Sequence, residues 1–207
     1  EEAATEIEKL GRRVLAVPTD VRKPEACKAM IEATIKHFGK LDILINNAGG
    51  AHGHVGLAKM DLAKWDRDVQ LNLSAATYCS HAAYPYLKAS KGCVVNISSQ
   101  AGVGGTQGVA AYSAAKAGLQ MLTKVMAAEW GPVGIRVNCV APGMTKTEAA
   151  ELGWGKRGFD AEASAKVSFS AASVTIADLP VDPTPAPQPS NTPSPSPSPS
   201  PTPTPSP

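Results

Sequence analysis

Residues 92–99 read Gly-Cys-Val-Val-Asn-Ile-Ser-Ser, and residues 111–116 read Ala-Tyr-Ser-Ala-Ala-Lys. The first stretch is a β-branched apolar run that ends in two serines, which is typical of a buried strand in a parallel sheet. The second stretch opens a long helical pattern, in which Tyr112 and Lys116 lie one turn apart on the same face. Ser99 is expected at the carboxyl end of the strand, where ligands bind in open α/β sheets.

This arrangement would bring a hydroxyl, a phenol and an ammonium to one rim of the fold. A nearby ammonium favours the phenolate, so Lys116 is expected to lower the pKa of Tyr112 from its free value of about 10. A phenol tuned in this way can exchange a proton with a carbonyl or alcohol oxygen. The Tyr-x-x-x-Lys pair alone also fits a half-buried helix with a solvated lysine, because two common residues recur at this spacing in many helices.

Composition indicates a globular protein and argues against several function classes. The 207 residues are 43% hydrophobic and 5% aromatic with a net charge of +2, which gives neither a charged field nor a stacking surface for nucleic acid. No apolar run approaches the ~18–20 residues of a membrane helix, and no basic-then-apolar leader is present. We therefore expect no nucleic-acid or membrane partner.

The cysteines indicate a reducing compartment. Cys27, Cys79, Cys93 and Cys139 form no Cys-x-x-Cys pair, and we interpret them as buried reduced thiols. This predicts a cytoplasmic protein. The sequence begins at Glu1 and looks like a piece of a longer chain, so an organellar form stays open.

A second polar motif follows another predicted strand. The sequence Asn46-Asn-Ala-Gly49 ends the apolar run that begins at Leu41. Small residues let a backbone approach a flat ligand, and asparagine amides can tie neighbouring strands together. An ordinary strand-to-helix turn is the alternative. The nearby His52 and His54 lack further ligands at usable spacing, so we predict no metal site.

Together these motifs resemble the short-chain dehydrogenase/reductase family. That family carries a serine, a tyrosine thirteen positions later and a lysine four positions after that, as Ser99, Tyr112 and Lys116 do. The resemblance covers about residues 1–150 and has five motifs in the family's order. These are Asp20, Asn46 to Gly49, Asn72, the Ser99/Tyr112/Lys116 set and Pro142-Gly143.

The resemblance implies hydride transfer between NAD or NADP and a secondary alcohol or carbonyl, most like a 3-oxoacyl-acyl-carrier-protein reductase. Tyr112 would be the proton donor or acceptor. Lys116 would lower its pKa and hold the nicotinamide ribose, and Ser99 would hydrogen-bond the substrate oxygen. Asn72 would order the lysine through a water. The choice between NAD and NADP cannot be made from this sequence.

The resemblance also implies a set of cofactor-binding residues. It includes Asp20 and Val21 at the adenine, and Pro142, Gly143 and Thr147 at the nicotinamide, with Thr145 as the runner-up to Thr147. The remaining residues in the set are Asn46, Ala48, Gly49, Tyr112 and Lys116.

The implied fold class is a Rossmann-like three-layer α/β/α parallel sheet that is truncated at both ends. The family's first strand with its glycine-rich pyrophosphate turn is missing, as are its last strand and substrate-covering helices. We predict that strands 41–46, 92–98 and 135–141 pair in parallel. Strand 14–17 would either dock abnormally beside 41–46 or stay unpaired. In the helix over 110–130 we expect Leu119, Leu122, Val125 and Met126 to face inward.

Three segments are predicted along the chain. Residues 1–150 form the partial domain, 151–179 are irregular, and 180–207 form a disordered Pro/Ser/Thr-rich tail. An inert tether is favoured for this tail over a ligand for proline-reading domains. The long helix after Asp61 resembles the family's dimer-forming element and predicts a homo-oligomer. The alternative function is a catalytically silent fragment that at most binds a partner subunit.

Overall fold

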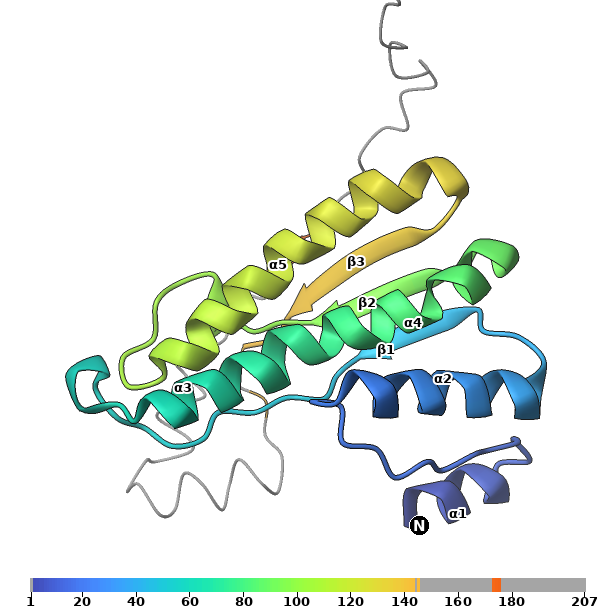
Figure 1. The fold of residues 1–207 in the computed structure, drawn as a ribbon, viewed down its shortest axis with the longest axis horizontal. Coiled ribbons are helices and arrows are strands. Elements are labelled where there is room, and N and C mark those ends of the chain that lie inside the picture. The colour runs from blue at the N-terminus through green and yellow to red at the C-terminus, as the bar shows by residue number, and fades with distance from the viewer. Residues whose placement is uncertain (1, 144, 146–172, 176–207) are drawn as a thin grey trace, which may run out of the picture.

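The computed structural model describes residues 2–143, 145 and 173–175 of the chain (Figure 1). Its sheet contains three parallel strands in the order β1-β2-β3, which are β1 (Ile43–Asn46), β2 (Cys93–Ile97) and β3 (Arg136–Ala141). Leu44 lies opposite Val94, and Val94 lies opposite Val137, so three buried side chains form one row across the sheet. The predicted parallel pairing is confirmed.

Within the described part of the chain, five α-helices accompany the sheet: α1 (Glu2–Lys9), α2 (Pro24–Phe38), α3 (Leu62–Val69), α4 (Ala75–Ser90) and α5 (Ala110–Trp130). Local sequence sets their ends. Pro24 occupies the first turn of α2, and Gly39 ends that helix in the left-handed region with φ 82°. The carboxylate of Asp61 caps α3 by accepting a hydrogen bond from the amide of Ala63 at 3.0 Å.

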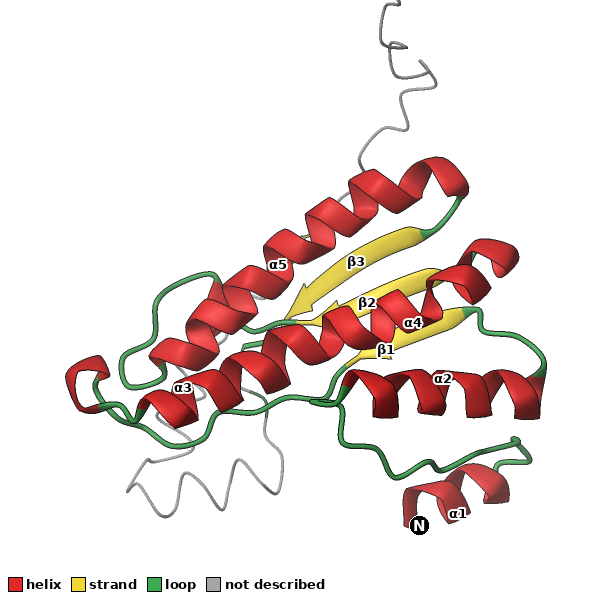
Figure 2. Ribbon diagram, viewed as in Figure 1, coloured by secondary structure: helices red, strands yellow, loops and turns green. Residues whose placement is uncertain are grey.

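The helices α4 and α5 pack on one face of the sheet, and α2 lies against α4 (Figure 2). The core between them contains Leu87 from α4, Met126 from α5 and Ile31 from α2, all buried. A single π-helical turn, Gln70–Ser74, joins α3 to α4. Such turns are frequent at functional sites, and this one carries Asn72. None of the described helices has the length and hydropathy that crossing a bilayer requires.

Residues 14–17 do not form the expected strand, because residues 12–19 form no regular element, and the segment stays unpaired, which is the second of the two expected outcomes. Among the described residues β1 is paired only with β2, so no ladder reaches this segment. The segment instead runs past the end of α2. There Arg13 donates a hydrogen bond to the carbonyl oxygen of His37 at 2.8 Å, and its guanidinium lies 5.0 Å from the centre of the Phe38 ring.

One further expectation needs correction. Leu119 and Met126 are buried and Leu122 packs against the core, but Val125 is 43% exposed and lines a surface groove. Within the segment of uncertain structure predicted over 151–179, the structure describes a short strand, β4 (Ser173–Thr175), which pairs antiparallel with β3. The remainder of that segment and the predicted tail lie outside the described residues.

The uncovered face of β1, at the edge of the sheet, should promote self-association. Ile43 and Ile45 are 58% and 60% exposed on the face opposite the helices, although parallel sheets are normally covered on both faces. Ile45→Lys should therefore reduce large assemblies at high protein concentration, as measured by sedimentation velocity. Leu44→Ala is the matched control, because Leu44 faces the core. It should lower the free energy of unfolding by about 2–5 kcal/mol. Unchanged assembly of Ile45→Lys would contradict the prediction.

Candidate active site

Lys116 is buried in α5, and its ammonium points at the end of β2. The residue is 3% exposed, and Nζ donates a hydrogen bond to the carbonyl oxygen of Ile97 at 2.7 Å. Burial disfavours the charged form and lowers the pKa of Lys116 from 10.5 to about 8. Tyr112 lies one helical turn earlier, and the ammonium is 5.7 Å from the centre of its ring. The structure therefore places the cation beside the phenol.

Asn72 connects the helical layer to the loop after β1. It is 1% exposed, its Oδ1 accepts a hydrogen bond from the amide of Gly50 at 2.9 Å, and its Nδ2 donates to the Gly50 carbonyl at 2.8 Å. Nδ2 also donates to the carbonyl of Asp68 at 2.9 Å, within its own helical segment. The side-chain amide thus forms hydrogen bonds with both the N–H and the C=O of Gly50.

Gly49 is where this loop reaches Lys116. A Cβ at Gly49 would lie 2.7 Å from Asn72 Oδ1 and 3.1 Å from Lys116 Nζ. The loop backbone, the amide and the ammonium therefore meet at one place. Any side chain at Gly49 would occupy the space beside the ammonium.

The asparagines behind the site tie the strands together, as the sequence predicted. Asn46 Nδ2 donates to Asn96 Oδ1 at 2.8 Å, and Asn96 Nδ2 donates to the hydroxyl of Thr123 at 2.9 Å. Asn46 also donates to the hydroxyl of Ser80 at 3.0 Å. Since Asn96 and Thr123 are buried, this chain of hydrogen bonds rigidly connects β1, β2, α4 and α5.

Several predicted cofactor residues line a small cavity of 90 Å³ at the carboxyl end of β1. The predicted residues among its lining are Val21, Asn46, Ala48 and Asn72. Asp20, next in sequence to Val21, is already engaged. Its Oδ1 accepts a hydrogen bond from Arg22 Nε at 2.8 Å, and this contact lowers the pKa of the carboxyl to about 2.

Ser99 lies where the sequence predicted, just beyond β2. Its Oγ accepts a hydrogen bond from the amide of Ala101 at 3.2 Å. The preceding Ser98 faces α5 and donates to the carbonyl of Lys116 at 2.8 Å. Alternation along the strand therefore directs Ser99 away from the helix and toward the loop that follows.

The Pro-Gly loop after β3 lies beside this region. The carbonyl of Pro142 accepts a hydrogen bond from the amide of Gln100 at 2.9 Å, which brings Gly143 near the serine loop. The hydroxyl of Thr145 donates to the carbonyl of Gly143 at 3.5 Å. Thr147 lies outside the described residues.

Tyr112 faces a cavity of 380 Å³ that the sequence did not predict. Its other lining residues are Ala51, Gly53, His54, Ala101, Thr106 and Val109. Two loops enclose this cavity, the one after β1 and the one between β2 and α5. They meet where the amide of Val55 donates to the carbonyl of Gly108 at 2.9 Å. The cavity gives a ligand access to the phenol.

Sequence reasoning also missed a close contact between an imidazole and a carboxylate next to Asn72. The side chain of Asp68 is 9% exposed, and Oδ1 contacts Nδ1 of His52. Asp68 lies four residues before Asn72 and so on the same face of its helix, which was the available signal. The position of His52 gave no signal, because the contact depends on how the loop folds back.

Gly49→Ala should disturb the site, because the new methyl group would press on Asn72 and Lys116. We expect a loss of about 1–3 kcal/mol in the free energy of unfolding, and weaker nicotinamide binding. Urea unfolding and a fluorescence titration would measure the two effects. Gly50→Ala is the matched control, since a Cβ there meets nothing within 4 Å. If the two variants have equal stability and equal nicotinamide binding, the space at Gly49 beside the Lys116 ammonium is not required.

Comparison with known proteins shows the family to which this chain belongs. The family model of the short chain dehydrogenases matches residues 1–154. Trans-4-hydroxycyclohexanecarboxylate dehydrogenase of Sinomonas cyclohexanicum is 44% identical over 153 residues, which are 72% of this chain and 57% of that protein. The 3-oxoacyl-acyl-carrier-protein reductase of a Synechocystis species is 37% identical over 142 residues, or 68% of this chain and 57% of that protein.

Solved structures show the same fold. Carveol dehydrogenase from Mycobacterium avium, solved in complex with NAD, superposes with a TM-score of 0.68 at 32% identity. The similarity covers 70% of this chain and 53% of that one. The chain thus spans little more than half the length of these relatives. On the family model and these identities, the chain belongs to the short chain dehydrogenase family.

Proposed function

We propose that this chain is the catalytic portion of an oxidoreductase that transfers hydride between NAD or NADP and a secondary alcohol or carbonyl. The observation that carries the proposal is the buried ammonium of Lys116, which lies beside the ring of Tyr112. The alcohol and ketone relatives named above support this reaction class, with 3-oxoacyl-acyl-carrier-protein reductase as one example.

The proposed roles follow from position. Tyr112 exchanges the proton with the substrate oxygen, because its side chain lines the cavity that a substrate would enter. Lys116 holds the nicotinamide ribose, and Ser99 binds the substrate oxygen from the end of β2. Asn72 positions the lysine by fixing the loop that backs it. The nicotinamide cofactor supplies the hydride chemistry.

The described residues fit the nicotinamide end of such a cofactor. Gly49 leaves a space beside Lys116 that a Cβ would fill, and the proposed ribose contact of Lys116 lies there. Pro142 and Gly143 lie near the same carboxyl edge of the sheet. Within residues 2–143 no glycine-rich turn follows an N-terminal strand, so these residues show no pyrophosphate cradle. A cytoplasmic location stays a prediction.

Titration of the folded chain with NADH and NADPH tests the proposal. We expect the nicotinamide fluorescence to rise on binding, and a secondary alcohol to be oxidised when the oxidised cofactor is supplied. Circular dichroism of the same sample establishes that the chain is folded. A folded chain that binds neither cofactor would overturn the proposal and leave the silent fragment as the better function.

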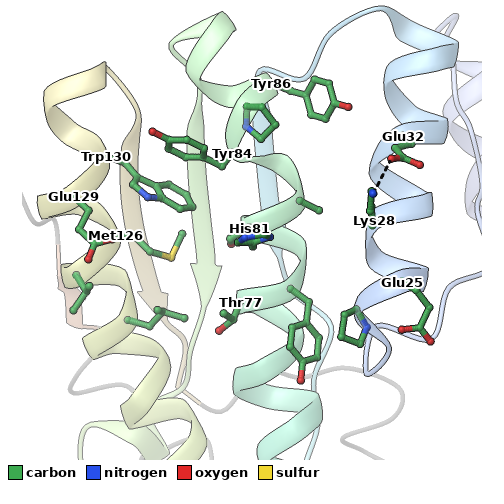
Figure 3. A pocket seen from close by; sticks show the side chains of 17 residues that line it. Glu25, Lys28, Glu32, Thr77, His81, Tyr84, Tyr86, Met126, Glu129 and Trp130 are labelled. Atoms are coloured by element: carbon green, nitrogen blue, oxygen red, sulfur yellow. Dashed lines mark ion pairs between the residues drawn. The ribbon is translucent and has the colours of Figure 1, made fainter.

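We further propose that a second copy of the chain binds at the groove between α4 and α5. The groove has a volume of 1,070 Å³ and extends to Lys28 and Glu32 of α2 (Figure 3). Its aromatic and apolar lining includes Tyr84, Trp130 and Met126. Met121 and Val125 of α5 are 58% and 43% exposed. Val125→Asp should therefore convert a dimer to a monomer in sedimentation equilibrium, and Lys124→Ala on the same helix is the control. A monomeric parent chain would refute this interface.

A further inference from the structure

We propose that His54 is a specificity-determining residue that binds a carboxylate on a compact secondary alcohol or ketone. The inference rests on the function proposed above and names the substrate class of the same site. It comes from the 380 Å³ cavity in front of Tyr112. Ligand sites commonly measure about 300–1,000 Å³, so this one fits a small substrate better than a long one.

The two histidines of the loop after β1 have different surroundings. His52 is engaged by the buried carboxylate of Asp68, which anchors the loop to the helix that carries Asn72. His54 forms no hydrogen bond to any residue that the structure describes, and it lines the cavity together with Tyr112. No described residue therefore forms a hydrogen bond with the His54 ring that a ligand at the substrate end of the site would have to displace.

The position of His54 is fixed by the opposite loop. The neighbouring amide of Val55 donates to the carbonyl of Gly108 at 2.9 Å. A Cβ at Gly108 would lie 2.9 Å from His54 Nδ1, so the imidazole sits directly against the glycine backbone. Gly108 also has φ +85°, a conformation that favours glycine. The ring thus lies against the opposite loop at the rim of the cavity, where His54 is also exposed to solvent.

The chemistry of the lining favours an anionic acceptor. The polar side chains on the cavity are His54, Thr106 and Tyr112, all of which can donate a hydrogen bond. None of the described lining residues is acidic, and the nearby carboxylate of Asp68 is taken up by His52. A carboxylate placed between His54 and Thr106 would leave the remainder of a short substrate to reach Tyr112.

The test is a cofactor-free binding experiment on the full chain with isotope-labelled histidine. Levulinate and methyl isoamyl ketone are the probes, because they share a methyl ketone and differ in a carboxylate against an isopropyl group of similar shape. We expect the His54 signals to shift on adding levulinate. Levulinate should bind about ten-fold more tightly than the neutral ketone, as for a hydrogen bond to a charged group.

His54→Ala should bring the ratio of the two affinities close to one. His37→Ala is the control, since His37 lies at the end of α2 against Phe38, and it should leave the ratio unchanged. Equal affinities in the parent chain, unshifted His54 signals or no binding of either ketone would overturn the inference. This experiment contains no cofactor. If levulinate binds as expected but the chain binds neither NADH nor NADPH, only the proposed hydride transfer is refuted.

Discussion

Replacing Tyr112 by phenylalanine should reduce turnover by about 10²–10⁴-fold, the usual contribution of a positioned acid or base. The change removes one oxygen atom and keeps the ring beside the Lys116 ammonium, so the packing of α5 should survive. The loss should appear in kcat, because proton exchange occurs in the chemical step and not in binding. Steady-state oxidation of a secondary alcohol would measure it.

A matched variant separates this effect from a general loss of a phenol. Tyr84→Phe removes the same atom from α4, at the groove that faces Trp130 and away from the cavity of Tyr112. It should leave kcat within about two-fold of the parent value, because the half-buried ring and its contact with Trp130 are kept and only one oxygen atom far from the site is lost. Retained activity in Tyr112→Phe would refute the acid-base role, whatever the result for Tyr84→Phe.

The sequence predicted the parts of the fold that depend on local pattern. The β-branched runs around Leu44, Val94 and Val137 define the three strands, because a strand buried on its core face needs an apolar row whatever surrounds it. The link between Asn46 and Asn96 was also predictable, since two amides at matching ends of adjacent parallel strands come into register. Family motifs then placed Tyr112 and Lys116 at the same edge.

Features that depend on a partner elsewhere in the chain were not predictable. Residues 14–17 have the composition of a strand, but the described residues offer no neighbouring ladder. Val125 has the period of a core residue, yet the space over α5 at that position is an open groove. The position of His54 depends on contact between two loops, and no periodic pattern reports such a contact.

Replacing Lys116 by methionine should abolish turnover and also change how stability depends on pH. The folded-state pKa of Lys116 is about 8, lowered by burial from 10.5 in the unfolded chain. Below a pH of about 8, Lys116 is charged in both the folded and the unfolded chain, so the folded protein carries the full cost of a buried cation. Between a pH of about 8 and 10.5, the unfolded chain binds more protons than the folded chain, so the free energy of unfolding of the parent chain rises with pH.

Methionine fills a similar space without titrating, so its variant lacks this rise. The stability of Lys116→Met relative to the parent chain should fall by about 2–3 kcal/mol between pH 7 and pH 10, at ~1.4 kcal/mol for each pKa unit. Urea unfolding at the two pH values measures this change. Lys124→Met, which removes an exposed lysine from the same helix, should show almost none of it.

One neighbouring group must be separated from Lys116. Burial raises the pKa of the Cys139 thiol, and the charge of Lys116 acts on it in the opposite direction, so the two titrations are linked. Repeating the comparison in a Cys139→Ala background removes that contribution. If the pH-dependent difference between lysine and methionine persists there, it belongs to the ammonium of Lys116. If the difference stays constant from pH 7 to pH 10, Lys116 is not a buried cation, and the observation that carries the proposed function is lost.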